Sequence, residues 1–274
     1  MELMPVDYAQ IARENERKYG TEIDNYGPKL LADRYSDPAH FVFELLQNAE
    51  DALGERLRSD KHSTLPKAAK FTLFKDRLEF RHFGIPFAEN HIRAICDIAR
   101  SSKQTTSGAI GHFGIGFKSV YAFTRSPEVH SCGESFVIES LVRPAPVAQK
   151  PTAEGETLFV LPFNHAETSS KESHGIITER LRELGPRTLL FLRHLDEIDW
   201  QIDGGGFGRY LRETQRKAEG VEHITLVGEE RGKATVEEHW LVFSRAVGGE
   251  NGASGLVEIA YQLQPTNEAR RHQI

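Results

Sequence analysis

The chain has 274 residues, 39% hydrophobic and 27% charged, which is enough for one large or two ordinary domains with a real core. Its 34 basic and 40 acidic residues give a formal net charge of −6, so no overall basic field attracts nucleic acid or a membrane surface. The two cysteines, Cys96 and Cys132, do not make a disulfide framework or a zinc site, which favours a reducing, cytoplasmic compartment. The sequence contains no apolar run of membrane-spanning length.

A polar stripe on a predicted helix is the first candidate site. Apolar residues recur on one broad face of residues 41–53, which predicts a helix. Glu44, Asn48 and Asp51 follow one another at i, i+4 and i+7 and border that face. A carboxylate there can deprotonate a water molecule, and an amide oxygen suits a hard cation such as Mg²⁺. The alternative is a solvated polar face without a ligand.

The next segment predicts two short strands within residues 71–80, around a turn at Lys75 and Asp76. The second strand runs into a short box, residues 78–87, that contains His82, Gly84 and Pro86. A second helix is predicted for residues 88–100 from its apolar period. Residues 101–108 are polar and end in glycine, which predicts a mobile loop.

A glycine-rich run follows this loop: Gly111-His-Phe-Gly-Ile-Gly-Phe-Lys-Ser119. Glycine lets the backbone approach a ligand closely, and free N–H groups before a helix form an anion site. The run differs from a P-loop, because Phe117 stands between the last glycine and Lys118, and from a dinucleotide-binding loop, because Ser119 replaces the third glycine. An ordinary glycine-rich turn is the alternative reading.

The remainder of the chain is rich in predicted strands. Residues 135–142, interrupted by prolines, and residues 156–162 are predicted strands, followed by helical periodicity over residues 173–195. A strand at 198–202 ends in a glycine turn at 204–206, and we predict a domain boundary at about residues 197–206. Beyond it we predict antiparallel strands at 223–227, 235–245 and 255–263.

Two of these segments together carry a family resemblance. Glu44-Leu-Leu-Gln-Asn-Ala-Glu-Asp-Ala52 resembles the N-box of the GHKL (Bergerat-fold) ATPases, which include DNA gyrase, the 90-kDa heat-shock chaperones, histidine kinases and mismatch-repair MutL. Their second glycine box resembles the run Gly108-Ala-Ile-Gly-His-Phe-Gly-Ile-Gly-Phe-Lys-Ser-Val-Tyr121. The sequences of the two boxes are most similar to those of the heat-shock chaperones and sacsin-like ATPases. The resemblance implies an α+β two-layer sandwich, in which helices cover a mixed, mainly antiparallel sheet.

The resemblance also implies a site for ATP and Mg²⁺. Glu44 would be the catalytic base and Asn48 the Mg²⁺ ligand, with Asp51 beside them. A lid at about residues 100–117 would fold over the phosphates. The other nucleotide-binding residues that it implies are His82, Gly84, Lys103, Gly111, Gly114, Ile115, Gly116, Phe117, Lys118 and Thr157.

The first glycine box departs from the family pattern. In the family an aspartate there accepts the exocyclic amine of adenine, whereas this chain has His82. Gly84 is kept, Pro86 replaces the second glycine, and Glu156 stands where a glycine usually precedes the strand threonine, here Thr157. A neutral histidine offers only one acceptor nitrogen, so selectivity for adenine is an open question.

The resemblance divides the chain into an ATP-binding domain, residues 1–200, and the strand-rich start of a truncated transducer-like domain, residues 206–274. Residues 1–27 would either pack as a helix on their own domain, which we favour, or exchange between subunits. The expected function is ATP binding and Mg²⁺-dependent hydrolysis. Lid closure would then be coupled to a chaperone-like cycle with a protein client, a partner domain or a nucleotide-dependent homodimer. The alternative is a nucleotide-binding or degenerate scaffold module without hydrolysis; a histidine kinase or a type II topoisomerase fits less well.

Overall fold

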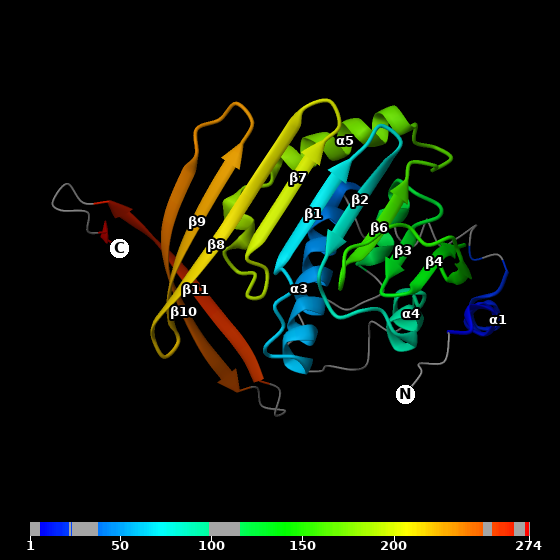
Figure 1. Ribbon diagram of the computed structural model, residues 1–274, viewed down its shortest axis with the longest axis horizontal. Coiled ribbons are helices and arrows are strands. Elements are labelled where there is room, and N and C mark those ends of the chain that lie inside the picture. Colours follow the sequence, from blue (N-terminus) through cyan, green and yellow to red (C-terminus); the bar gives the residue numbers. More distant parts are fainter. Residues whose placement is uncertain are drawn as a thin grey trace.

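The computed structural model describes residues 6–21, 23, 38–98, 116–248, 254–265 and 272–273. It shows an α+β fold in which one large, mixed, open sheet runs through the described chain (Figure 1). The strand order is β12-β11-β10-β9-β8-β7-β1-β2-β6-β3-β4-β5. The strands are β1 (Ala68–Leu73), β2 (Arg77–His82), β3 (Glu128–Ser131), β4 (Glu134–Glu139), β5 (Arg143–Pro146), β6 (Thr157–Pro162), β7 (Glu197–Ile202), β8 (Gly206–Ala218), β9 (Val221–Glu230), β10 (Val236–Gly248), β11 (Ser254–Pro265) and β12 (His272–Gln273).

The sheet is mainly antiparallel, as expected from the sequence. Among the described strands, β1 and β7 form the parallel pair, and the remaining neighbours pair antiparallel. A parallel pair needs a long crossover connection, and here it runs from β1 through all the intervening elements to β7. The finer assignment to the Bergerat two-layer arrangement remains an expectation.

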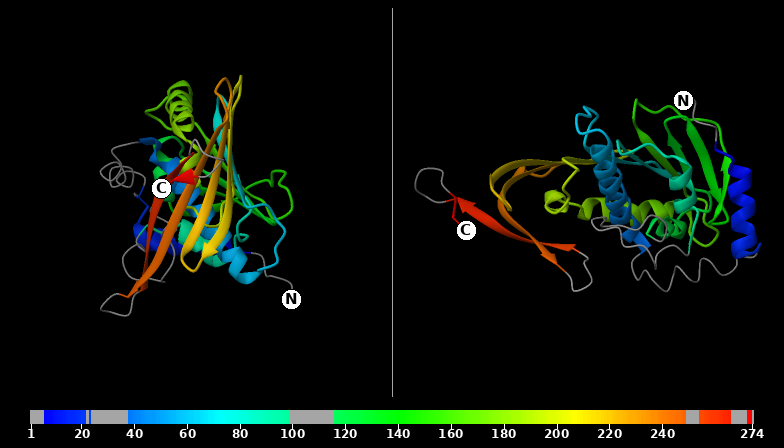
Figure 2. Two further views of the ribbon diagram at one scale, coloured as in Figure 1. Left: turned by 90° about the vertical axis from the view of Figure 1, so that its left-hand side faces the viewer. Right: turned by 90° about the horizontal axis from the view of Figure 1, so that it is seen from below.

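The helices are α1 (Tyr8–Tyr19), α3 (Phe41–Ser59), α4 (Glu89–Ile95) and α5 (Ser170–Glu183), with short 3₁₀ turns η1 (Pro38–His40), η3 (Phe117–Ala122) and η4 (Pro186–Leu189). Helices α3 and α5 lie on the same face of the sheet (Figures 1 and 2). None of the helices in the described part of the chain is long and apolar enough to cross a membrane.

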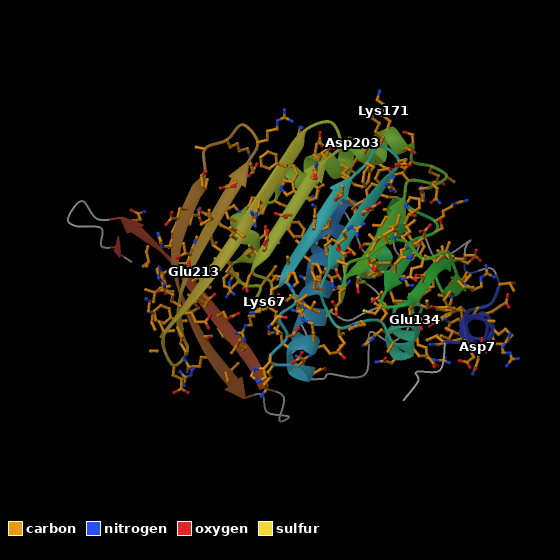
Figure 3. The ribbon with its side chains drawn as sticks, viewed as in Figure 1. Asp7, Lys67, Glu134, Lys171, Asp203 and Glu213 are labelled. Carbon is orange, nitrogen blue, oxygen red and sulfur yellow. The ribbon has the colours of Figure 1, made fainter. Side chains whose placement is uncertain are left out.

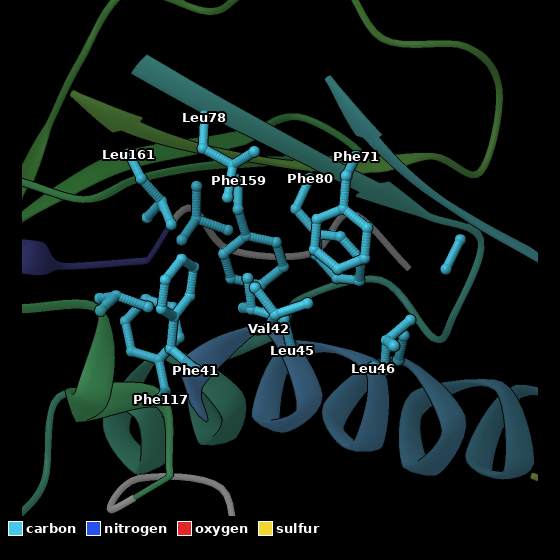
Figure 4. Packing of buried hydrophobic residues seen from close by; sticks show 14 of the residues in the cluster. Phe41, Val42, Leu45, Leu46, Phe71, Leu78, Phe80, Phe117, Phe159 and Leu161 are labelled. Carbon is cyan, nitrogen blue, oxygen red and sulfur yellow. The ribbon is translucent and has the colours of Figure 1, made fainter. Parts of the chain in front are cut away.

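The core lies between α3 and strands β1, β2 and β6 (Figure 4). Phe71 and Phe80 pack across the β1–β2 pair with ring centroids 4.5 Å apart and ring planes tilted by 34°, and both are fully buried. On α3 the facing residues Phe41, Val42 and Leu45 are at most 1% exposed. Burying each such side chain stabilises the fold by about 1.5–3 kcal/mol. The apolar residues whose spacing predicts a helix at residues 41–53 therefore form the face that holds α3 on the sheet.

The N-terminal helix α1 packs against strands β4 and β5 at the edge of the sheet. Asp7 caps α1 by accepting a hydrogen bond from the N–H of Gln10 (2.8 Å). Asn15 donates to the carbonyl of Val142 (2.7 Å), and Tyr8 bonds Glu134 on β4, which Figure 3 labels beside the helix. These contacts fix α1 near β4 and β5.

Several predicted boundaries were wrong. Strands β3 and β8 were not predicted, and the prolines at 144 and 146 lie within the edge strand β5, where a missing N–H costs little. The helix predicted for residues 88–100 is α4, which ends at Ile95; residues 99–100 lie outside the described part. Gly204 and Gly205, at φ of 93° and 131°, form the turn of the β7–β8 hairpin. The sheet continues across this turn, and a domain boundary there remains a prediction.

Candidate functional site

Helix α3 positions the first group of candidate residues. The Glu44 side chain is 19% exposed, and Asn48 is 7% exposed although its amide is polar. Asp51 follows on the same stripe and is half-buried. The stripe therefore lies at the edge of the buried face, where the sequence pattern predicts it, and is not a fully solvated surface.

Gly116 lies directly against the Glu44 carboxylate. A Cβ built on Gly116 would overlap the Oε2 atom of Glu44, so a larger residue would push the carboxylate away. This contact brings the last glycine of the glycine-rich run to the candidate base. The other predicted residues of that region, Lys103, Gly111, Gly114 and Ile115, lie outside the described residues.

His40 is a neighbour of Glu44 that the sequence reasoning missed. Its Nε2 atom lies 3.3 Å from Glu44 Oε1, one helical turn away. The signal in the sequence was a histidine four residues before a glutamate at a helix start, a spacing at which side chains meet. His40 therefore fixes one oxygen of the carboxylate while Gly116 lies against the other.

A second glycine lies against α3 two turns further along. A Cβ on Gly84 would overlap the Cβ of Ala52, and the N–H of Ile85 donates to the Ala52 carbonyl (2.9 Å). His82, at the end of β2, is 2% exposed, and its Nδ1 accepts a hydrogen bond from the N–H of Gly84 (3.0 Å). The first glycine box is thus folded tightly onto the helix that carries the Glu44–Asp51 stripe.

The environment of His82 keeps its ring neutral. Burial, helped by the nearby Arg56 guanidinium, lowers the pKa of His82 from 6.5 to about 3. The rings of Phe80 and Phe159 lie 5.8 and 5.9 Å away and enclose the imidazole. A protonated His82 is therefore excluded under physiological conditions.

Thr157 lies opposite His82 across the β2–β6 pair and is fully buried. Its hydroxyl is 2.7 Å from that of Ser131, which also accepts a hydrogen bond from the N–H of Phe87 (3.1 Å). Ser131 was not predicted, because only the pairing of β3 with β6 brings it there. Glu156, which precedes Thr157, accepts hydrogen bonds from Arg81 (2.9 Å) and from the N–H of Ala153 (3.0 Å). These bonds account for a carboxylate where the family has glycine.

Lys118 and Phe117 have structural partners. Lys118 is 1% exposed, and its ammonium donates to the carbonyls of Ile95 (2.7 Å) and Leu141. Burial lowers the pKa of Lys118 to about 8. Phe117 packs against Phe159, with ring centroids 5.7 Å apart. Both side chains anchor η3 in the core, and we leave them out of the proposed phosphate site.

Comparisons with known proteins agree with part of the resemblance. Residues 29–145 match the Sacsin domain family. The Protein NO VEIN of Arabidopsis thaliana is 30% identical over 191 residues, which cover 62% of this chain and 7% of that protein. The chain thus spans a small part of this relative. Together, the two matches support a sacsin-like family for this chain.

Proposed function

We propose that this domain binds ATP together with Mg²⁺ and hydrolyses the ATP to ADP and phosphate. The observation that carries the proposal is that two glycines lie against one helix, Gly116 at Glu44 and Gly84 at Ala52. At a rise of 1.5 Å per residue, these points on α3 are about 12 Å apart. That span suits a nucleotide with its terminal phosphate near Glu44 and its base near His82.

Glu44 would act as the general base. Its carboxylate would accept a proton from the water that attacks the terminal phosphorus, while the bond to the ADP oxygen breaks. His40, 3.3 Å from Oε1, would hold the carboxylate in a fixed orientation. Only glycine at position 116 lets the backbone lie this close to the carboxylate, because any side chain there would overlap Oε2.

The residues on α3 are suited to a magnesium ion. Mg²⁺ prefers oxygen ligands and is commonly held by one or two protein groups together with phosphate oxygens. Asn48 would supply its amide oxygen, with Asp51 near enough on the same stripe to orient ligating waters. The ion would neutralise charge on the phosphate oxygens.

The biological use of the hydrolysis is a further part of this proposal. Lid closure over the nucleotide would drive a chaperone-like change of shape in the cytoplasm, acting on a protein client, a partner domain or a second copy of the chain. The support is the sacsin-like match alone, and similarity of fold does not fix function.

A scaffold without hydrolysis is the second candidate function. It is favoured by His82 and Glu156, which replace two residues of the family pattern. Glu44 and Asn48, retained together on one stripe, favour hydrolysis over this alternative.

The deciding experiment is phosphate release by Glu44→Ala compared with wild type. We expect turnover to fall by about 10²–10⁴-fold with ATP binding retained, because the variant lacks the general base. Glu55→Ala, on the same helix with a side chain 42% exposed, is the matched control. Unchanged turnover in Glu44→Ala would contradict the assignment. Calorimetry with and without Mg²⁺ on Asn48→Ala then tests the metal ligand, and absence of ATP binding by the wild type would favour the scaffold.

A further inference from the structure

We infer that His82 contacts the base of the bound nucleotide through an N–H donor, so that purine nucleotides with a 6-oxo group bind at least as tightly as ATP. The inference rests on the proposed function, because it concerns the base end of the same site. It follows from the hydrogen bonding of one buried side chain.

The tautomer of His82 follows from its contact with Gly84. The N–H of Gly84 donates to Nδ1 at 3.0 Å, so this ring nitrogen carries no hydrogen. A neutral imidazole carries one hydrogen in total, which must then be on Nε2. The lowered pKa of His82, about 3, keeps the ring neutral near physiological pH. His82 therefore offers a donor at Nε2 and has its acceptor occupied.

The ring is held so that it cannot easily exchange these roles. The atom that joins its two nitrogens, Cε1, lies 3.0 Å from the position that a Cβ on Gly84 would take, beside Ala52 of α3. The nitrogen-bearing edge of the imidazole therefore lies beside Gly84, which itself packs on Ala52. Phe80 and Phe159 pack on the ring, and a rotation would leave the Gly84 N–H without its acceptor.

The polar groups beside His82 do not select between bases. The hydroxyls of Thr157 and Ser131 lie 2.7 Å apart, and either can be the donor in that bond. A hydroxyl can also donate to or accept from a ligand, so this pair tolerates either kind of group. The guanidinium of Arg56 is engaged by the carbonyls of Leu65, Pro66 and Phe83. Unlike the two hydroxyls, the neutral ring of His82 has a fixed hydrogen-bonding direction.

Adenine and guanine differ in whether the group at the 6-position donates or accepts a hydrogen bond. Adenine presents an amino group, a donor, at the 6-position, whereas guanine presents an oxygen, an acceptor. An N–H at His82 cannot bond an amino group, but it can bond the oxo group or a ring nitrogen. A carboxylate at this position would have the reverse preference. His82 therefore removes the selection for the 6-amino group that an aspartate would impose.

The test is calorimetry of the whole 274-residue chain with Mg²⁺ and ATP, GTP or ITP, where ITP differs from ATP only in its 6-oxo base. We expect wild type to bind ITP at least as tightly as ATP. His82→Asp should shift the ratio of the two Kd values toward ATP by about tenfold or more, because it exchanges a donor for an acceptor. His62→Asp, on an exposed loop, is the matched control and should leave the ratio unchanged.

Two further results keep the outcomes distinct. His82→Asn retains both a donor and an acceptor and should keep the wild-type ratio; if His82→Asp fails to fold, the wild-type ratio of the ATP and ITP Kd values decides the question. Wild-type binding of ATP that is about threefold or more tighter than that of ITP would overturn the inference while leaving nucleotide binding intact. Failure of all three nucleotides to bind would overturn the proposed function as well.

Discussion

The two halves of the sheet are made of similar residues but have different environments. In the half covered by helices, Phe71 and Phe80 are fully buried between β1, β2 and α3. In the open half, at the other end of the sheet, Phe243 on β10 and Ile259 and Tyr261 on β11 are 37–52% exposed. Aromatic and β-branched residues form strands in both halves. The comparison teaches that a helix on the sheet, and not strand composition, decides where the core and the candidate site form.

Glu50 joins the two halves. It lies on α3, is 2% exposed, and accepts hydrogen bonds from the N–H groups of Arg193, His194 and Leu195 at 2.6–2.9 Å. These residues lead into β7, and the Arg193 side chain bonds Glu258 on β11 (2.6 Å). The helix of the candidate site is therefore connected through Arg193 to β11 of the open half.

The largest effect is expected for Phe80→Ala in the covered half. Removing a fully buried phenyl ring should lower the free energy of unfolding by about 3–5 kcal/mol, because the surrounding core cannot collapse around the cavity. Urea denaturation measures this change. A loss below about 1 kcal/mol would mean that α3 does not pack on β2 as described.

A somewhat smaller effect is expected for Glu50→Ala at the junction. The variant leaves three backbone N–H groups without their acceptor, which should cost about 2–3 kcal/mol. The same denaturation experiment applies, with the exposed Glu154→Ala as control. Stability equal to that of the control would show that the junction contributes nothing to the fold.

Acidification should destabilise the covered half through His82. The folded pKa of about 3 lies below the unfolded value of 6.5, so the unfolded state binds a proton first as the pH falls. The contribution of neutral His82 to the free energy of unfolding is fully present above about pH 6.5 and falls progressively toward pH 3. Between about pH 7 and 5 the loss should be about 2 kcal/mol. His82→Asn should lack this part of the pH dependence, and an identical pH profile would contradict the neutral, buried ring.

The smallest effect is expected for Phe243→Ala in the open half. Phe243 is 37% exposed and makes an edge-to-face contact with Tyr261 at 5.9 Å. Losing that contact should cost about 1 kcal/mol or less, well below the cost of Phe80→Ala. A loss as large as that of Phe80→Ala would mean that another part of the molecule covers this face.

The sequence pattern predicted some elements better than others for physical reasons. The period of residues 41–53 predicted α3, since a helix that buries one face must repeat apolar residues at that spacing. Strand β8 has charged residues at many positions and was missed, because its pairing with β7 and β9 creates the strand. Strand β3 is only four residues long and gave no clear period.

The sequence by itself determined the stripe of Glu44, Asn48 and Asp51, because helical spacing fixes which side chains share a face. Only the tertiary structure decided that Gly116 lies against Glu44 and that Gly84 packs on Ala52. It also turned Lys118 inward to two carbonyls. These contacts join residues far apart in the chain, and their geometry depends on how the sheet and α3 pack, which local spacing does not specify.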